Sequence, residues 1–268
     1  MTAFMYHFAL SFRTGLRDKQ LLFVNDLFPL AFYLMMGFVM TEINPAFRTS
    51  LVPAMVVLTV MFATLMGIPD PLVKAREDGI LRSYRINGVP VTSVLAIPFL
   101  STTIHTIIIT GVILLTAGPL FDAPMPVDMF TFFSTFLAMS FASAGFGTLI
   151  GVLAPSTTMT ILLAQAVFLP SMLLGGLMVP HSMFTGAIEA AAWFLPASHA
   201  MNAFNGLSMG YETTLSPMAS LGMLMASGLI AFLLSYVFYN WDRRNIRRRG
   251  HPVLALLPLL PLAASLFI

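Results

Sequence analysis

Charged side chains of both signs are concentrated in one short stretch of the sequence, PLVKAREDGILRSYRINGVP, at residues 71–90. The stretch holds four of the thirteen basic residues of the chain and two of its eleven acids. Mixed charge in water suits docking to a complementary surface, because charge patterns steer a partner and fix its register. The residues concerned are Lys74, Arg76, Glu77, Asp78, Arg82 and Arg85. We interpret this stretch as the face that the protein presents to a cytoplasmic partner.

Sequence motifs for enzymatic chemistry are absent. The chain has no Gly-x-x-x-x-Gly-Lys-Ser/Thr phosphate loop, no His-Glu-x-x-His zinc helix and no Gly-x-Ser-x-Gly elbow. It also has no cysteine, which excludes disulfides and cysteine-based metal or redox chemistry. The polar residues His7, His181, His199 and Glu212 are too scattered to form a membrane-enzyme site. We therefore expect that the chain alone neither binds nor hydrolyses ATP.

His105 is the one ionisable residue expected at mid-membrane, and Gln165 is a polar residue with the same two interpretations. Each either hydrogen-bonds to a neighbouring Ser, Thr or backbone carbonyl, or lines a substrate path. Asp26 lies near the end of its apolar run, which favours a solvated carboxylate over a proton relay. A proton-coupled secondary transporter usually has a carboxylate at mid-membrane, and we expect none there.

The composition requires a bilayer as the solvent. The chain is 58% hydrophobic and 9% charged, whereas a soluble domain has roughly 25% charged residues. Its long, continuous apolar runs favour helices over a barrel. We predict an all-α polytopic membrane protein, with one transmembrane domain over residues 1–268. Its six spans are expected at about residues 21–40, 51–68, 91–117, 130–153, 159–179 and 218–239.

Both ends of the chain differ from the spans. Residues 1–20 repeat an apolar residue every fourth position, which predicts an amphipathic helix in the membrane interface, with the start of the first span as the alternative. Residues 242–249 are strongly basic. The apolar tail at 253–268 contains two prolines and as an α-helix would reach only ~24 Å, short of the ~30 Å hydrocarbon core. We favour an interfacial or partly inserted tail over a seventh crossing.

Three local patterns predict how the connections are built. Asp70-Pro71 is a plausible helix start, Gly79 divides the charged stretch, and Asn87-Gly88 ends it. The segment at 183–195 is mostly apolar but too short to cross, so a re-entrant helix pair is predicted between spans five and six, with an interfacial loop as the alternative.

Small residues recur every four positions in the fourth span, at Ser143, Gly147 and Gly151. This spacing allows helices to approach closely. The pattern favours packing within the chain over a seam between two copies.

Basic residues in alternate loops predict the orientation. One side of a six-span arrangement receives twelve Lys and Arg residues, and the other receives only Arg48. By the positive-inside rule, the N-terminus and residues 71–90 are cytoplasmic. The basic pI near 9.2 is then explained by topology and by contact with anionic lipids, without nucleic-acid binding.

The order of these elements resembles the membrane subunit of a type-2 ATP-binding-cassette (ABC) exporter, close to the daunorubicin-resistance permease group. Residues 75–82, AREDGILR, resemble the Arg/Lys-Glu-x-Gly-Thr/x-Leu pattern of that family, and Val89-Pro90 opens the next span. LPSMLLGGLMVPHSMF at 169–184 and LPASHAMNAF at 195–204 resemble its second signature, a Gly-rich span end followed by Leu-Pro-x-x-His/Tyr. The similarity covers about residues 1–245, and the apolar tail departs from it.

The resemblance implies a six-span permease whose ATP and Mg are bound by a separate ATPase chain, with no cofactor on this one. Two permeases, as a homodimer or pseudo-dimer, work with two ATPase chains in the bacterial plasma membrane. The charged stretch becomes a coupling helix that docks into the ATPase, through Lys74, Arg76, Glu77, Asp78, Gly79, Arg82, Tyr84 and Arg85. Candidate path or gate residues are His105, Gln165, Met178, Pro180 and His199.

Substrate and mechanism have alternatives. The chain holds 20 Met and 24 Phe, and such flexible, polarizable side chains suit an amphiphilic drug or lipid-like substrate, although they could also simply face lipid. Export of a polysaccharide or other glycoconjugate is the alternative within the family. A secondary transporter or channel would work without ATP and would be expected to show inverted repeats, which we do not find.

Overall fold

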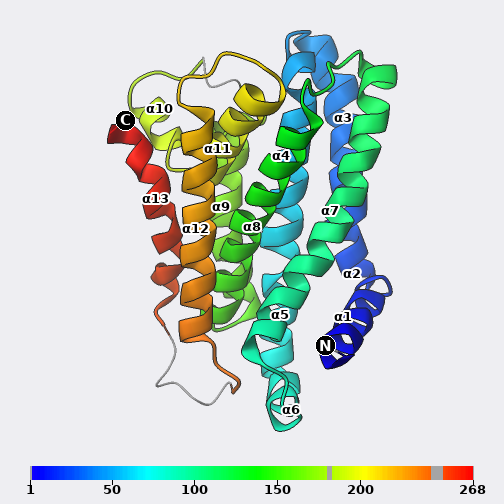
Figure 1. Ribbon diagram of the computed structural model, residues 1–268, viewed down its shortest axis with the longest axis vertical. Helices are drawn as coiled ribbons and strands as arrows, with labels where there is room; N and C mark the ends of the chain where they lie inside the picture. Colours follow the sequence, from blue (N-terminus) through cyan, green and yellow to red (C-terminus); the bar gives the residue numbers. More distant parts are fainter. Residues whose placement is uncertain (1, 180–182, 243–249, 268) are drawn as a thin grey trace.

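In the part of the chain that the structure describes, six helical segments are long and apolar enough to cross a membrane, and they stand side by side in Figure 1. The computed structural model describes residues 2–179, 183–242 and 250–267, and these contain helices but no strand. The segments are Lys19–Ile43, Phe47–Glu77, α7 (Val91–Phe121), α8 (Met129–Leu153), α9 (Thr157–Leu174) and α12 (Pro217–Phe238). The predicted six-span, all-helical architecture is confirmed.

The first two segments are each built from consecutive elements. The first comprises α2 (Lys19–Leu22), the π-helical turn η1 (Phe23–Leu27) and α3 (Phe28–Ile43), and the second comprises α4 (Phe47–Gly67) and α5 (Pro69–Glu77). Short helices lie outside them: α1 (Thr2–Gly15), α6 (Ile80–Ile86), α10 (Ala187–Ala192) and α11 (Pro196–Ala203), the last followed by the π-helical turn η3 (Phe204–Ser208). We call the end of the bundle that carries α1 and α6 the basic end, after Arg13, Arg17, Lys19, Lys74, Arg82 and Arg85 (Figure 1).

Two helices, α4 and α8, form the centre of the bundle. In each, 89% of the most apolar 18-residue window is buried inside the protein, against 28% for the first span, α9 and α12. The peripheral helices therefore have wide apolar faces that are free to contact lipid or a second protein. Thr59 and Thr64 in α4 donate their hydroxyl hydrogens to carbonyls four residues earlier, which satisfies these polar groups without water.

The small residues of α8 lie where it contacts the second span. A Cβ atom at Gly147 would collide with the backbone carbonyl of Thr64, and one at Gly151 would lie 3.0 Å from the Pro69 Cα. The Ser143 and Thr64 hydroxyls are hydrogen-bonded to each other at the same contact. The predicted close packing is therefore confirmed, and it lies within one chain.

The predicted helix start at Asp70 is wrong. Only Ile68 separates α4 from α5, Pro69 opens the new helix, and Asp70 already lies in its first turn. The N–H groups of a first helical turn have no partner inside the helix, so a proline there removes no hydrogen bond. The chain can therefore continue in nearly the same direction past both prolines. The second span and α5 consequently form a helical segment of 31 residues that projects from the bundle.

The apolar tail runs lengthwise beside α12 (Figure 1). It comprises η5 (Pro252–Leu259) and η6 (Ala264–Phe267), both 3₁₀ helices, with one turn of α-helix, α13 (Leu260–Ala263), between them. The Ser227 hydroxyl of α12 donates to the Pro258 carbonyl. A 3₁₀ helix rises about 2.0 Å per residue, so the tail is about 30 Å long rather than the α-helical length assumed from sequence. It packs against α12 and is not among the six segments long enough to be candidate spans.

The segment between α9 and α12 closes the end opposite α6. Helix α9 ends at Leu174, earlier than predicted, because Gly175 and Gly176 follow it and Gly176 has φ +81°. Every residue of α11 is buried, among α4, α8, α9 and α12. Polar groups of this helix must therefore be satisfied by protein partners.

We expect that Gly147→Ala lowers the thermal stability of the purified protein by about 1–3 kcal/mol, the usual cost of overpacking. The added methyl group has to push α8 away from the Thr64 carbonyl. Gly111→Ala in α7 is the matched control, because a Cβ atom there meets nothing within 4 Å. A melting temperature for Gly147→Ala equal to that of Gly111→Ala would contradict the assigned contact.

Candidate functional site

The charged stretch folds into a helical hairpin, α5 and α6, that extends from the basic end (Figure 1). Gly79 joins the two helices with φ +75°, a left-handed conformation that costs glycine little. Gly88 has φ +72° after α6, and the Val89 N–H donates to the Tyr84 carbonyl at 3.0 Å. The predicted break at Gly79 and the predicted end at Asn87-Gly88 are confirmed.

Arg76 does not contribute to the outer surface of this hairpin. Its side chain is buried, at 4% exposure, and points to the C-terminal end of α8. The guanidinium donates to the carbonyls of Gly151 at 3.3 Å, Val152 at 2.8 Å and Ala154. These carbonyls lack partners inside their own helix and carry the negative end of its dipole, so a buried cation is stabilised there. Arg76 therefore anchors the hairpin to a central helix of the bundle.

An apolar layer supports the hairpin on the same side. Leu72 and Leu81 are buried against Leu95 and Val152, and Tyr239 at the end of α12 completes the cluster. Burial raises the pKa of the Tyr239 hydroxyl, although the nearby Arg76 opposes the shift, so the ring stays neutral in this layer. The hairpin is thus attached to α7, α8 and α12 by packing as well as by hydrogen bonds.

The outer surface of the hairpin combines charge with one exposed apolar side chain. Arg82 and Arg85 are exposed on α6, Asp78 is exposed beside Gly79, and Glu77 is half-buried. Within the described part of the chain, no acid lies within ion-pair distance of either arginine. Ile86, next to them, is 78% exposed. Unpaired charge around an exposed aliphatic side chain is typical of a docking surface.

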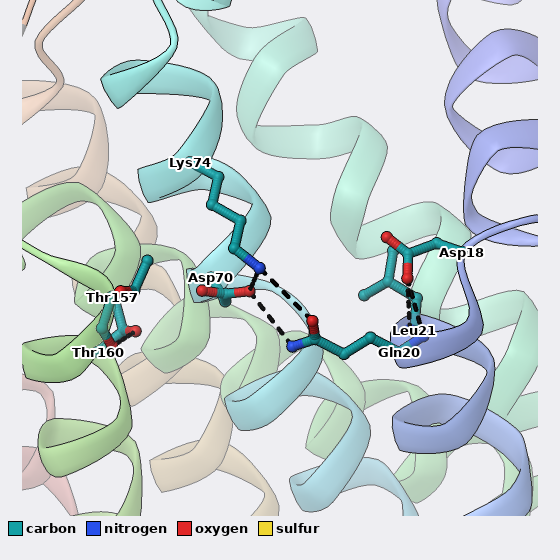
Figure 2. A network of polar contacts seen from close by, with 7 residues as sticks. All are labelled: Asp18, Gln20, Leu21, Asp70, Lys74, Thr157 and Thr160. Carbon is teal, nitrogen blue, oxygen red and sulfur yellow. Dashed lines mark hydrogen bonds and ion pairs between the residues drawn. The ribbon is translucent and has the colours of Figure 1, made fainter.

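A polar network connects this hairpin to the first span, as Figure 2 shows. The Lys74 ammonium forms an ion pair with Asp70 at 2.6 Å, one helical turn earlier in α5. The Gln20 amide, from α2, reaches both side chains at 3.4 and 3.5 Å. The network is largely exposed, so its contribution to stability is about 0–1 kcal/mol and its main effect is to orient α2 against α5.

A cleft of about 400 Å³ opens beside this network, between α2–η1, the second span and α9. Asp70 and Lys74 line its polar end, with Thr157 and Thr160 of α9 across from Gln20 (Figure 2). Farther along α9, Gln165 also lines the cleft, and its buried amide oxygen has no hydrogen-bond partner in the described structure. The sequence left two alternatives for Gln165, a hydrogen bond to a neighbour or a place in a substrate path. The hydrogen bond is not found in the described structure.

His105 is bonded to an acid rather than to a hydroxyl or a carbonyl. Its Nδ1 lies 2.9 and 3.0 Å from the two carboxylate oxygens of Asp26, and the ring is 4% exposed. The Phe12 ring of α1 packs over it, with 5.3 Å between centroids. Asp26 is thus paired with His105 while its side chain keeps 26% exposure, so the expected solvated carboxylate is found only in part. Sequence reasoning missed this pair, although intramembrane ionisable residues commonly pair with one another.

The remaining predicted path residues lie elsewhere. His199 is fully buried in α11, where Nε2 donates to the Trp193 carbonyl at 2.9 Å and Nδ1 lies 3.4 Å from the Ser220 hydroxyl of α12. It fixes the turn between α10 and α11. Met178 packs partly buried on the core, and Pro180 lies outside the described residues. The structure therefore does not bring His105, Gln165, Met178 and His199 together at one site.

Replacing Arg76 by Met is expected to lower the stability of the protein by about 2–3 kcal/mol, since buried carbonyls at the end of α8 lose their charged donor. Arg82→Met is the matched control, because Arg82 is exposed and within the described structure bonds to nothing. Thermal unfolding and limited proteolysis at the hairpin report the change. Equal stability of the two variants would exclude the anchoring role.

The comparisons with known proteins give one match. Residues 2–208 match the family described as ABC-2 type transporter. The matched range contains the α5–α6 hairpin, α11, and the first and second spans, which border the cleft. The chain matches no curated protein and no solved structure. The family match covers more than half of the sequence and agrees with the six spans of the structure. The chain therefore belongs to the ABC-2 type transporter family, as the transmembrane component of an ABC transporter.

Proposed function

We propose that this chain is the permease subunit of an ATP-driven exporter, and that the α5–α6 hairpin is the element through which a separate ATPase drives it. The proposal rests on the hairpin, because one side of it is attached to the bundle and the other side is exposed. Its inner side is fixed to α8 through Arg76, while its outer side has exposed Arg82, Arg85 and Ile86. A partner that displaces such an element displaces the spans attached to it.

ATP binding and hydrolysis are assigned to the partner chain. The printed sequence has no phosphate-binding loop, and ABC-2 permeases pair with ATPase subunits. On the permease side, the exposed basic pair of α6 favours an acidic cleft on the ATPase, with Ile86 buried at its centre. The amphipathic α1 would lie in the membrane interface and brace the hairpin from the side, since it packs on α7.

The cleft between the first span, the second span and α9 is the proposed translocation path. It is polar at the basic end, through Asp70 and Lys74, and apolar beyond it, with the unpartnered Gln165 amide in its wall. Leu27 and Ile161, on the helices that border it, are more than half exposed. A second copy of the chain placed against these faces would close the cleft into a channel, which supports a dimer.

An amphiphilic drug or lipid-like molecule fits this cleft, because one end offers charge and the walls offer aliphatic and aromatic surface. This agrees with the resemblance to drug-exporting permeases of the daunorubicin-resistance group. A polysaccharide would instead need a wetter path with aromatic platforms. The only aromatic residue that lines the cleft within the described structure is Phe62, which disfavours that alternative.

The basic end is assigned to the cytoplasm of a bacterial cell, with the N-terminus on that side. The twelve-to-one distribution of Lys and Arg supports this orientation. The buried α11 segment then lies on the external side as a re-entrant gate, tied to α12 through Ser220. Movement of α12 would reach the gate through this contact.

Ile86→Asp and Arg82→Glu are expected to abolish co-purification of the partner ATPase, or to reduce it at least about ten-fold, because the docking surface loses its apolar centre or gains repulsion. Expression and thermal stability should stay near wild type, since both residues are exposed. The partner for co-expression is an ABC ATPase, sought first in the reading frames adjacent to this one.

Val127→Asp is the matched control, with the same kind of change at a residue that is 82% exposed at the opposite end. It should retain the ATPase. Retention of the ATPase by Ile86→Asp and Arg82→Glu would mean that the hairpin is an ordinary solvated connection.

Thr160→Phe tests the path separately, because it narrows the cleft from α9 and leaves the exposed docking residues of α6 unchanged. Transport of rhodamine 6G into inverted vesicles is expected to fall at least about ten-fold as the bulky ring blocks the path. Co-purification of the ATPase should be unchanged. The exposed Thr214→Phe is the control, and equal transport by both variants would exclude this cleft as the path.

A further inference from the structure

A second cavity, of about 370 Å³, lies on the other side of α2–η1 from the translocation cleft. Gln20 and Val24 face the cleft, whereas Leu21 and Asn25 face this cavity. Its walls come from α1, the α5–α6 hairpin and the first half of α7. Asp18 and Ile80 line it and are also solvent-exposed, so the cavity opens at the basic end. We call it the hairpin cavity.

The unpaired amide oxygen of Asn25 is the first observation that indicates a ligand in the hairpin cavity. Its side chain is 6% exposed, lines the cavity, and its amide oxygen has no hydrogen-bond partner in the described structure. A buried amide oxygen without a partner costs about 1–3 kcal/mol, so it is normally retained for a reason. The π-helical turn η1 presents Asn25, and Gly67 leaves it room, since a Cβ there would lie 2.7 Å from the oxygen. Such π-helical turns occur frequently at functional sites.

His105 adds a second acceptor in the wall of the cavity. Its Nδ1 lies 2.9 Å from the Asp26 carboxylate, which fixes the orientation of the ring in the cavity wall. The other ring nitrogen, Nε2, accepts a hydrogen bond whenever the ring is neutral. His105 and Asn25 therefore line the same cavity.

The charge of the lining favours a donor group over an anion. Asp18 contributes a carboxylate at the open end, and no Lys or Arg occurs among the described residues that line the cavity. The rest of the wall is largely aliphatic, with Leu21, Ile97 and Leu81. Acceptors at a polar end and an aliphatic body match an amphiphile with a protonated amine.

We propose that the hairpin cavity is a binding site for lipophilic primary amines, separate from the translocation path. The ammonium group is held by the Asn25 amide oxygen and His105 Nε2, near the Asp18 carboxylate, and the apolar body packs on Leu21 and Ile97. Because Leu81 and Tyr84 of the hairpin also line the site, an occupant contacts the hairpin directly. Binding therefore alters the freedom of the hairpin relative to α1 and α7, which makes the site regulatory.

A matched pair of fluorescent probes tests the site in the full chain, in phosphatidylcholine nanodiscs with empty nanodiscs as background. Dansylcadaverine has a primary ammonium group, and dansyl-6-aminohexanoate has a carboxylate on the same linker. We expect the wild-type protein to bind the amine at least about ten-fold more tightly, by fluorescence anisotropy, because acceptors line the site. Equal affinity for the two probes would overturn the proposal, and this comparison requires no variant.

Variants locate the binding. Asn25→Leu is expected to weaken amine binding about ten-fold by removing an acceptor to a charged donor. Asn205→Leu is the matched control, because Asn205 also lies in a π-helical turn with a buried, unpartnered amide oxygen, at η3. Equal binding by the two variants contradicts the site. Loss of amine binding in Thr160→Phe, with retention in Asn25→Leu, would place the amine in the translocation cleft instead.

The binding measurement needs no ATPase and no transport. Its failure would therefore leave the proposed permease function unaffected, and failure of the coupling variants at Ile86 and Arg82 would leave this site unaffected.

Discussion

The hydrogen bonds from Arg76 to the C-terminal carbonyls of α8 are the interaction on which the rest of the basic end depends. A guanidinium is expensive to bury alone, and main-chain carbonyls at a helix end are expensive to leave without donors. In this structure the Arg76 guanidinium donates to the carbonyls at the end of α8, so neither group is left without a partner. The contact joins the hairpin to α8, which lies at the centre of the bundle, and so a displacement of the hairpin is transmitted to helices that have little room to yield.

Continuity of α4 into α5 extends this connection along the membrane. The 31-residue helical segment has one end among the buried side chains of the core and the other end in the hairpin. Gly147 and Gly151 of α8 lie close to its backbone, at the Thr64 carbonyl and the Pro69 Cα. Close backbone contact makes the two helices move together, because interiors packed at this density shift as units rather than deform continuously.

Several polar residues lie around η1 and α2, which separate two spaces at the basic end. On one side, Gln20 joins Asp70 and Lys74 at the mouth of the cleft; on the other, Asn25 faces the hairpin cavity, and the adjacent Asp26 holds His105. The α5–α6 hairpin borders both spaces. A molecule in either one therefore contacts the element that is proposed to receive the movement of the ATPase.

The sequence alone determined the features that depend on composition and local conformation. Apolar length set the six spans, because an unsatisfied backbone is not tolerated in lipid, and glycine conformations set the break at Gly79 and the end at Gly88. Tertiary structure decided what depends on contacts between distant residues. Asp26 and His105 are 79 positions apart, and only the packing of α7 on the first span pairs them. Arg76 resembles its exposed neighbours in sequence, yet the nearby end of α8 makes it an internal anchor. The length of the tail also follows from the structure, because a 3₁₀ helix is longer per residue than an α-helix, and the Ser227 hydroxyl of α12 donates to the tail at Pro258.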